Sequence, residues 1–283
     1  MPGTLFVVAT PIGNLEDLTF RALRTLREVD LVAAEDTRRT ARLLSHYEVR
    51  KPLVSLHEHN EHRSAEHLVS RMQAGESIAL VSDAGTPAIS DPGHHLVAAA
   101  RSAGIPVIPI PGACAAAVAL SVSGLPADKF AFFGFPPSSG AARERWFERA
   151  AAEPATIVCY ESPHRIARTL QELAQYTGIR PIFLARELTK LNEHLVVWDK
   201  NEAVREQGEF VVVVGPAEPE VVTEPESASV ATFIGQIIEH IGLGEDEAVA
   251  LAATRFSIGT TKVRKLLKKG RILVKRSSDN QES

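Results

Sequence analysis

Short apolar runs alternate with longer stretches of helical spacing through the first half of the chain. The apolar runs predict strands at residues 5–9, 31–34, 53–56, 77–81 and 105–110. Helical spacing or composition predicts helices at residues 15–29, 37–47, 62–74 and 94–102. Because strand and helix alternate, and because the strands are apolar throughout, we expect a parallel sheet covered by helices on both faces.

The pattern changes after Gly112, where helices become fewer than strands. Helices are predicted at residues 113–121, 141–151 and 163–176. Strands are predicted at residues 130–135, 155–160, 181–185, 194–198 and 209–214. The lower ratio of helices to strands predicts a mixed sheet for this half.

These patterns predict an α/β protein with two α/β domains and a small helical region. Residues 1–112 form the first domain, with the parallel sheet, and residues 113–215 form the second, with the mixed sheet. Residues 216–229 are rich in Pro and Glu, a composition typical of an extended linker. Residues 230–283 follow as a basic helical region, of which residues 277–283 are expected to be disordered.

The final region carries a concentrated positive charge. Nine basic residues and no acidic residue lie between Arg255 and Ser278. Apolar residues at helical spacing occur on either side of Gly259, at Ala248, Leu251, Ala252, Val263, Leu266 and Leu267. Two short helices around a glycine turn resemble a helix-turn-helix, and the basic face favours contact with nucleic acid. A disordered basic tail is the alternative.

Net charge, cysteine content and the length of the apolar runs narrow the possible partners and cellular location of the chain. The formal net charge of −4 gives no further indication of a nucleic-acid partner. Cys114 and Cys159 form no disulfide framework, which favours a reducing compartment. There is no apolar run long enough to span a bilayer and no signal-peptide pattern. We therefore expect a cytoplasmic protein without a membrane partner.

Candidate chemistry concentrates at the predicted carboxyl ends of strands, where ligands bind in α/β folds. The richest segment is Val81–Gly93, in which small residues, Pro, Gly and two Asp follow a buried strand. Small residues let a ligand approach the backbone, Pro fixes the loop, and Asp supplies an acceptor. Thr10–Asp17 follows the first strand in the same way, although a tight turn with Asp17 capping a helix explains it equally well.

Charged residues gather at three other strand ends. Ala34–Thr40 contains Glu, Asp and two Arg; Asp36 can cap the next helix, and Arg38 can grip a phosphate. A solvated helix start with ion pairs is the alternative for that segment. Cys159–Arg165 and Ala185–Lys190 each place a Glu and a basic residue after an apolar strand. Their matching positions indicate that they converge on one cleft.

A histidine-rich segment, His57–His62 with His67 beyond it, is the candidate for a metal site. His59 and His62, or His62 and His67, can share a face. Their spacing fits no familiar metal site, and no cysteine is near. No metal is therefore expected, and a polar loop that faces a substrate is the favoured interpretation.

Together these motifs resemble the tetrapyrrole methylase superfamily of S-adenosylmethionine-dependent methyltransferases. The segments that carry the resemblance are Ala9–Leu15, Ala33–Arg38, Leu56–Glu61, Ala79–Pro87, Asp91–Gly93, Ser123–Pro126, Tyr160–Arg165 and Ala185–Lys190. They cover about residues 3–215, and their number and order make the resemblance specific. It implies two α/β domains with S-adenosylmethionine in the cleft between them, and a homodimer.

Two departures from the wider family's pattern indicate a branch within it. Thr10–Gly13 stands where many members carry G-x-G-P-G, and Ser82–Gly85 stands where they carry Gly-Asp-Pro. The resemblance then implies the RNA-directed branch, which methylates a cytidine 2′-oxygen of 16S ribosomal RNA, free or in the small ribosomal subunit. A porphyrinoid C-methyltransferase and a non-catalytic, RNA-binding ribosome assembly factor are the alternatives.

The resemblance also places the cofactor contacts by position. They fall at Pro11, Ser82, Asp83, Ala84, Ile89, Ser90, Ala115, Tyr160, Arg186 and Glu209. The resemblance assigns no general base. Among the charged motif residues, Asp36 and Glu187 are the candidate bases, with His59 in reserve. Arg38, Arg186 and Lys190 are expected to position phosphate.

Overall fold

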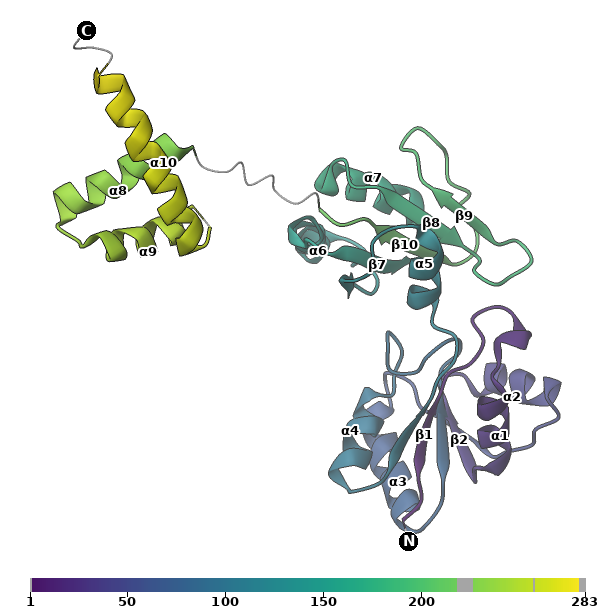
Figure 1. The fold of residues 1–283 in the computed structure, drawn as a ribbon. Coiled ribbons are helices and arrows are strands. Elements are labelled where there is room, and N and C mark those ends of the chain that lie inside the picture. Colours follow the sequence, from purple (N-terminus) through teal and green to yellow (C-terminus); the bar gives the residue numbers. More distant parts are fainter. Residues whose placement is uncertain (1, 218–225, 257, 280–283) are drawn as a thin grey trace. The chain divides into compact units, whose positions relative to one another are not determined.

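The structure, a computed structural model, describes residues 2–217, 226–256 and 258–279 (Figure 1). The chain divides into two compact units, Met1–Ala217 and Glu218–Ser283. Most of the segment expected to be a linker, residues 218–225, lies outside the described residues. Within the described residues, no helix combines the length and the apolar character needed to cross a membrane.

The first unit begins with a five-stranded parallel sheet of order β3-β2-β4-β1-β5. Its strands are β1 (Leu5–Val8), β2 (Leu31–Ala34), β3 (Leu53–Ser55), β4 (Ile78–Val81) and β5 (Val107–Ile110). The three central strands are almost wholly buried, because side chains from both of their faces enter a core. The parallel sheet predicted from continuous apolar runs is confirmed.

Helices cover both faces of this sheet (Figure 1). They are the 3-10 helix η1 (Leu15–Asp17), α1 (Phe20–Glu28), α2 (Thr37–His46), α3 (Glu61–Gln73) and α4 (His94–Ser102). Leu26 and Leu44 of α1 and α2 pack on one face, whereas Leu68 and Leu96 of α3 and α4 pack on the other.

The prediction of a single helix at residues 15–29 is wrong, because η1 and α1 are separate. The chain breaks there because the Thr19 hydroxyl accepts the Ala22 N–H at 3.1 Å and starts a new helix.

A second five-stranded sheet follows, of order β6-β7-β10-β8-β9. Its strands are β6 (Phe130–Phe132), β7 (Thr156–Glu161), β8 (Ile182–Arg186), β9 (His194–Val197) and β10 (Phe210–Val214), and its helices are α5 (Ala115–Ser123), α6 (Gly140–Ala152) and α7 (Ile166–Thr177). β6 pairs in parallel with β7, and the other pairs are antiparallel. The mixed sheet is therefore confirmed.

The two sheets of the first unit share part of their core. Ile12, from the loop after β1, packs in one apolar cluster with Ala116 of α5 and with Val211 and Val213 of β10. The loop after β1 is therefore attached to the second sheet while its strand belongs to the first. This shared cluster positions the carboxyl edge of the parallel sheet against the second sheet.

The second unit contains α8 (Ser227–Ile241), α9 (Glu245–Arg255) and α10 (Thr260–Asp279) around one small apolar core. Val249 and Val263 are buried in it, whereas Leu251 is 45% exposed and lies outside the stripe that was expected to contain it. The two helices predicted on either side of Gly259 are present. The helix α10 extends to Asp279 and so includes residues 277–279. Residues 280–283 lie outside the described part.

Candidate active site

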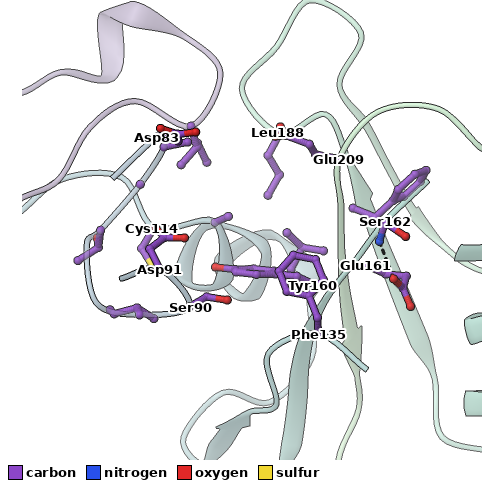
Figure 2. Close-up of a pocket in the computed structure, with 18 of the residues that line it drawn as sticks. Asp83, Ser90, Asp91, Cys114, Phe135, Tyr160, Glu161, Ser162, Leu188 and Glu209 are labelled. Carbon is purple, nitrogen blue, oxygen red and sulfur yellow. Dashed lines mark hydrogen bonds between the residues drawn. The ribbon is translucent and has the colours of Figure 1, made fainter. Parts of the chain in front are cut away.

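A cavity of about 340 Å³ opens at the carboxyl edge of the parallel sheet, facing α5 and β7 (Figure 2). Its volume lies within the range of roughly 300–1,000 Å³ that is usual for small-molecule sites. Most of the predicted cofactor contacts border it, namely Asp83, Ala84, Ile89, Ser90, Ala115, Tyr160 and Glu209. Contacts predicted from four separate segments of the sequence thus meet at one cavity.

The loop after β4 forms one wall and holds an unusual backbone shape. Gly85 and Thr10 exchange both backbone hydrogen bonds, at 2.8 and 3.0 Å, which ties this loop to the loop after β1. Ala88 and Ser90 adopt φ values of 65° and 127°, which L-residues rarely occupy. Each such residue costs on the order of 1–3 kcal/mol and persists only where its surroundings fix it. The wall of the cavity is therefore preorganised.

Three carboxyl groups line this side of the cavity: Glu35, Asp83 and Asp91. Burial raises the pKa of Glu35, and the charges of Asp83 and Asp91 add to that rise, although the Asp83 N–H partly offsets it. Burial also raises the pKa of Asp91. Arg39 contributes the nearest guanidinium, 3.4 Å from an Asp83 carboxylate oxygen. Such a concentration of negative charge favours a cationic ligand over a neutral one.

The opposite wall is aromatic. The Tyr160 ring packs against Phe135 and Phe132, with centroids 5.6 and 4.9 Å away. Its hydroxyl accepts the Ala116 N–H at 3.3 Å, at the start of α5. Burial raises the pKa of this phenol to about 12, so it stays neutral across the physiological range. This wall offers a flat apolar surface that suits a planar ring.

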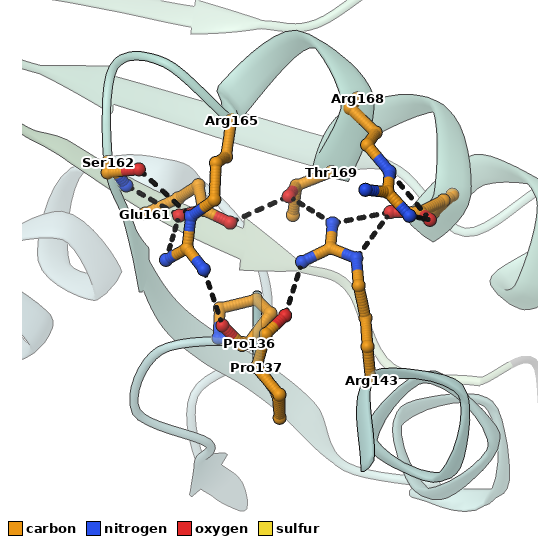
Figure 3. A network of polar contacts seen from close by, with 9 residues as sticks. Pro136, Pro137, Arg143, Glu161, Ser162, Arg165, Arg168 and Thr169 are labelled. Atoms are coloured by element: carbon orange, nitrogen blue, oxygen red, sulfur yellow. Dashed lines mark hydrogen bonds and ion pairs between the residues drawn. The ribbon is translucent and has the colours of Figure 1, made fainter. Parts of the chain in front are cut away.

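A polar network around Glu161 fixes the end of β7 (Figure 3). Glu161 borders the cavity, but its carboxylate accepts the Ser162 N–H and the Thr169 hydroxyl, both at 2.6 Å, and pairs with Arg165 at 2.7 Å. Buried Arg143 extends the network, donating to the Thr169 hydroxyl at 2.7 Å and pairing with Glu172. The Glu161 carboxylate thus serves the structure rather than a ligand.

A second hollow of about 340 Å³ lies beside the first and shares a wall with it. The residues common to both are Ile12, Arg39, Asp83, Ala84 and Glu209. Pro11 and Ser82, predicted as cofactor contacts, and Lys190, predicted to position phosphate, border this second hollow. Lys190 donates to Glu187 at 2.8 Å and to Glu209 at 2.9 Å.

Asp36 and Arg38 border neither space, since both are committed to the start of α2. The Asp36 carboxylate accepts the Arg38 N–H at 2.8 Å and pairs with the Arg38 guanidinium at 2.9 Å. The hydrogen bond from the Arg38 side chain lowers the pKa of Asp36 to about 2. Asp36 is therefore a helix cap, as the sequence allowed, and remains fully ionised at neutral pH.

The remaining predicted residues also lie outside both spaces. Glu187 accepts from Lys190 and from the Glu209 N–H, and the bond from Lys190 lowers its pKa. Arg186 donates to the Gln207 carbonyl at 2.7 Å. His59 is exposed, its ring 6.0 Å from that of His57. The geometry does not bring these side chains to the cavity, so their proposed roles gain no support from it.

Among the described residues, the group with the composition of a metal site is Glu61 with His94 and His95, not the predicted histidine pairs. One Glu61 oxygen already accepts the Gly93 and His95 N–H groups, both at 2.8 Å, and so caps α4. His94 is 66% exposed. The positive end of a helix disfavours a cation, and helix capping accounts for the buried carboxylate.

Sequence reasoning missed Glu35 and Arg39, which both border the cavity. They flank the two residues that were chosen from the same segment, Asp36 and Arg38. The sequence signal that could have identified Glu35 and Arg39 was the helix cap at Asp36. A residue that caps α2 turns back toward its own amides, which leaves its neighbours to face the sheet edge.

Comparison with known proteins agrees with this geometry. Residues 4–203 match the family described as Tetrapyrrole (Corrin/Porphyrin) Methylases. The chain belongs to the tetrapyrrole methylase family. The family resemblance of the sequence motifs is thereby confirmed, and this family member is a methyltransferase.

Curated relatives of this tetrapyrrole methylase share close to half of its residues. The protein called "Ribosomal RNA small subunit methyltransferase I" in Pseudomonas aeruginosa is 49% identical over 221 residues, which are 75% of this chain and 78% of the relative. The protein of that name in Halalkalibacterium halodurans is 46% identical over 265 residues, 89% of this chain and 90% of the relative.

Solved structures show the same fold at low identity. The methyltransferase CobJ aligns with a TM-score of 0.59 and 21% identity, over 76% of this chain and 95% of CobJ. The uroporphyrin-III-C-methyltransferase of Thermus thermophilus aligns with a TM-score of 0.53 and 22% identity, over 75% of this chain and 94% of that one. These similarities establish the fold of the first unit.

Proposed function

We propose that this tetrapyrrole methylase transfers a methyl group from S-adenosylmethionine to a cytidine 2′-oxygen in the 16S RNA of the small ribosomal subunit. The observation that carries the proposal is 46–50% identity, over most of the chain, to relatives named for methylation of small-subunit ribosomal RNA. The solved structures whose titles name a uroporphyrin methyltransferase, and which favour the porphyrinoid alternative, are only 20–22% identical to this chain. The cytoplasm is the expected location for such a substrate.

The residues of the cavity fit S-adenosylmethionine. This molecule combines a cationic sulfonium with a planar base and a ribose, and when bound it supplies an electrophilic methyl group on a good leaving group. Asp83 and Asp91 place negative charge along one wall, where it favours a cation. Tyr160 and Phe135 supply the flat apolar wall that suits a base.

The second unit supports an RNA partner. Arg264, Lys265, Lys268 and Lys269 are exposed along α10, while Val263 of the same helix is buried. The apolar side of this helix is thus occupied by the core, and its basic side is left to solvent. Each phosphate neutralised by such a surface adds about −0.7 to the salt slope for single-stranded nucleic acid. A homodimer is expected from the family resemblance, and sedimentation velocity measures it.

Tritium transfer tests the proposed function. Purified protein is incubated with methyl-labelled S-adenosylmethionine and one of three acceptors: unmodified 16S RNA, unmodified small subunits, or a porphyrinogen. We expect label in RNA, recovered as 2′-O-methylcytidine after digestion to nucleosides. Label in the porphyrinogen alone would support the porphyrinoid enzyme. Salt-sensitive RNA binding without any transfer would support the assembly factor, and either result would refute the proposal.

A further inference from the structure

Arg39 and Asp83 line both the cofactor cavity and the neighbouring hollow, so a ligand in either space would lie next to these side chains. We propose that the hollow receives the acceptor nucleotide through its phosphate, held by Arg39 and Arg42, and that Glu35 takes the proton from the attacking hydroxyl. The inference rests on the proposed methyl transfer and adds to it a substrate site and a base.

The basic side of the hollow suits a phosphate. Arg39 and Arg42 are three residues apart on α2, a spacing that places both guanidinium groups on one face. Arg42 is exposed, and within the described residues no ion pair engages it. Arg39 is 62% exposed and holds Asp83 only loosely, at 3.4 Å. Two neighbouring guanidinium groups of this kind can grip phosphate oxygens bidentately.

Glu35 differs from the neighbouring Asp83 in having an oxygen free to accept a further hydrogen bond. Asp83 accepts the Asp36 N–H at 3.0 Å through one oxygen and faces Arg39 with the other. Glu35 makes one long contact, from the Asp83 N–H to Oε2 at 3.4 Å, and its Oε1 has no hydrogen-bond partner among the described residues. Burial and nearby negative charge raise its pKa, which makes it a stronger base than an exposed carboxylate.

Asp36 and Glu187, the candidate bases named from the sequence, do not combine an unpartnered carboxylate oxygen with a raised pKa. Asp36 is paired with Arg38 and has a pKa lowered to about 2, and Glu187 is held by Lys190 with a lowered pKa. A carboxylate stabilised as an anion has little tendency to accept a proton. Glu35 is also the only one of the three that borders the cofactor cavity.

The proposed step balances without a further reactant. The hydroxyl oxygen forms a bond to the methyl carbon as the carbon–sulfur bond breaks, and the electron pair of that bond remains on sulfur. The hydroxyl proton passes to the Glu35 carboxylate and later to water. The products are a methyl ether and a neutral thioether, so the positive charge of the donor leaves as a proton.

The test of the base combines Glu35→Gln, Glu35→Asp and the matched control Glu66→Gln, an exposed residue of α3. We expect Glu35→Gln to lower the single-turnover rate by roughly 10²–10⁴-fold. We also expect the wild-type rate to rise with pH as Glu35 loses its proton, and Glu35→Gln to abolish that rise. The affinity for S-adenosylmethionine, measured by calorimetry, should stay within about threefold of wild type. Glu35→Asp should keep the pH-dependent rise at a reduced rate.

The test of the hollow needs no turnover. Binding of a cytidine-containing oligonucleotide is measured in the presence of S-adenosylhomocysteine for Arg42→Gln and for the matched control Arg24→Gln on α1. We expect about tenfold weaker binding for Arg42→Gln and no change for Arg24→Gln.

Several outcomes would overturn the inference: wild-type rates in Glu35→Gln, loss of cofactor affinity in that variant, or unchanged oligonucleotide binding in Arg42→Gln. These outcomes differ from failure of the proposed function, in which the wild-type protein itself would transfer no methyl group to RNA.

Discussion

The network behind the cavity predicts a large loss of stability on Glu161→Ala. The substitution removes the acceptor of the Ser162 N–H, the Thr169 hydroxyl and the Arg165 guanidinium. Removing one partner of a buried ion pair typically costs 3–5 kcal/mol. Because the Arg165 side chain is 27% exposed, it recovers part of its hydration, which places the expected loss at about 3 kcal/mol. For a unit of this size, that loss lowers the Tm by about 6–12 °C.

Urea unfolding followed by tryptophan fluorescence measures this loss, since Trp146 is buried in the core of the second sheet and lies on α6 with Arg143. Glu161→Gln keeps one acceptor oxygen and should lose less than Glu161→Ala. Glu148→Ala, which removes the same charge from an exposed position of α6, should change stability by no more than about 0.5 kcal/mol. A loss below about 1 kcal/mol for Glu161→Ala would refute the argument that this carboxylate holds the end of β7.

Three further predictions concern other parts of the chain. Cys114, which borders the cavity, should react with iodoacetamide more slowly when S-adenosylmethionine is present, whereas buried Cys159, whose pKa is raised by burial, should react only after unfolding. The phenol of Tyr160 should ionise only near pH 12 in a spectrophotometric titration compared with that of Tyr160→Phe. Because the pKa of this phenol is raised in the folded state, its contribution to stability is complete below about pH 10, the pKa of an unfolded tyrosine. That contribution is lost as the pH rises toward the folded-state pKa of about 12. The double variant Lys265→Glu, Lys268→Glu should weaken RNA binding and flatten its salt dependence, while circular dichroism shows unchanged helix content.

The strands and most helices of the first unit could be predicted because their cause is local. A strand such as Leu31–Ala34 is apolar throughout because it is buried on both faces, and that property is visible in the sequence. The break before α1 was harder to predict, because apolar residues at helical spacing continue across it. One hydroxyl, that of Thr19, decides where the new helix begins.

The site could be located from the sequence but not resolved to individual side chains. The family resemblance named Asp83, Ser90 and Tyr160 as cofactor contacts, and these residues lie at strand ends that the fold brings to one cavity. Which of Glu35 and Asp36 faces the cavity depends on the direction of each side chain, and that is set by the cap of α2. The pKa values of these two carboxyl groups then diverge because one is buried and the other is paired with Arg38.

If the proposed function holds, the negative charge of the cavity affects both the binding of the methyl donor and the release of its demethylated product. Asp83 and Asp91 both line the cavity, and burial raises the pKa of Asp91, an arrangement that costs stability when Asp91 is ionised. A cationic donor relieves that cost on binding, whereas the neutral product leaves the carboxylates without a counter-charge. The same groups therefore favour binding of the donor and release of the spent cofactor. A structural role alone would not require acidic groups at this wall, because an apolar wall would pack against Tyr160 at lower cost.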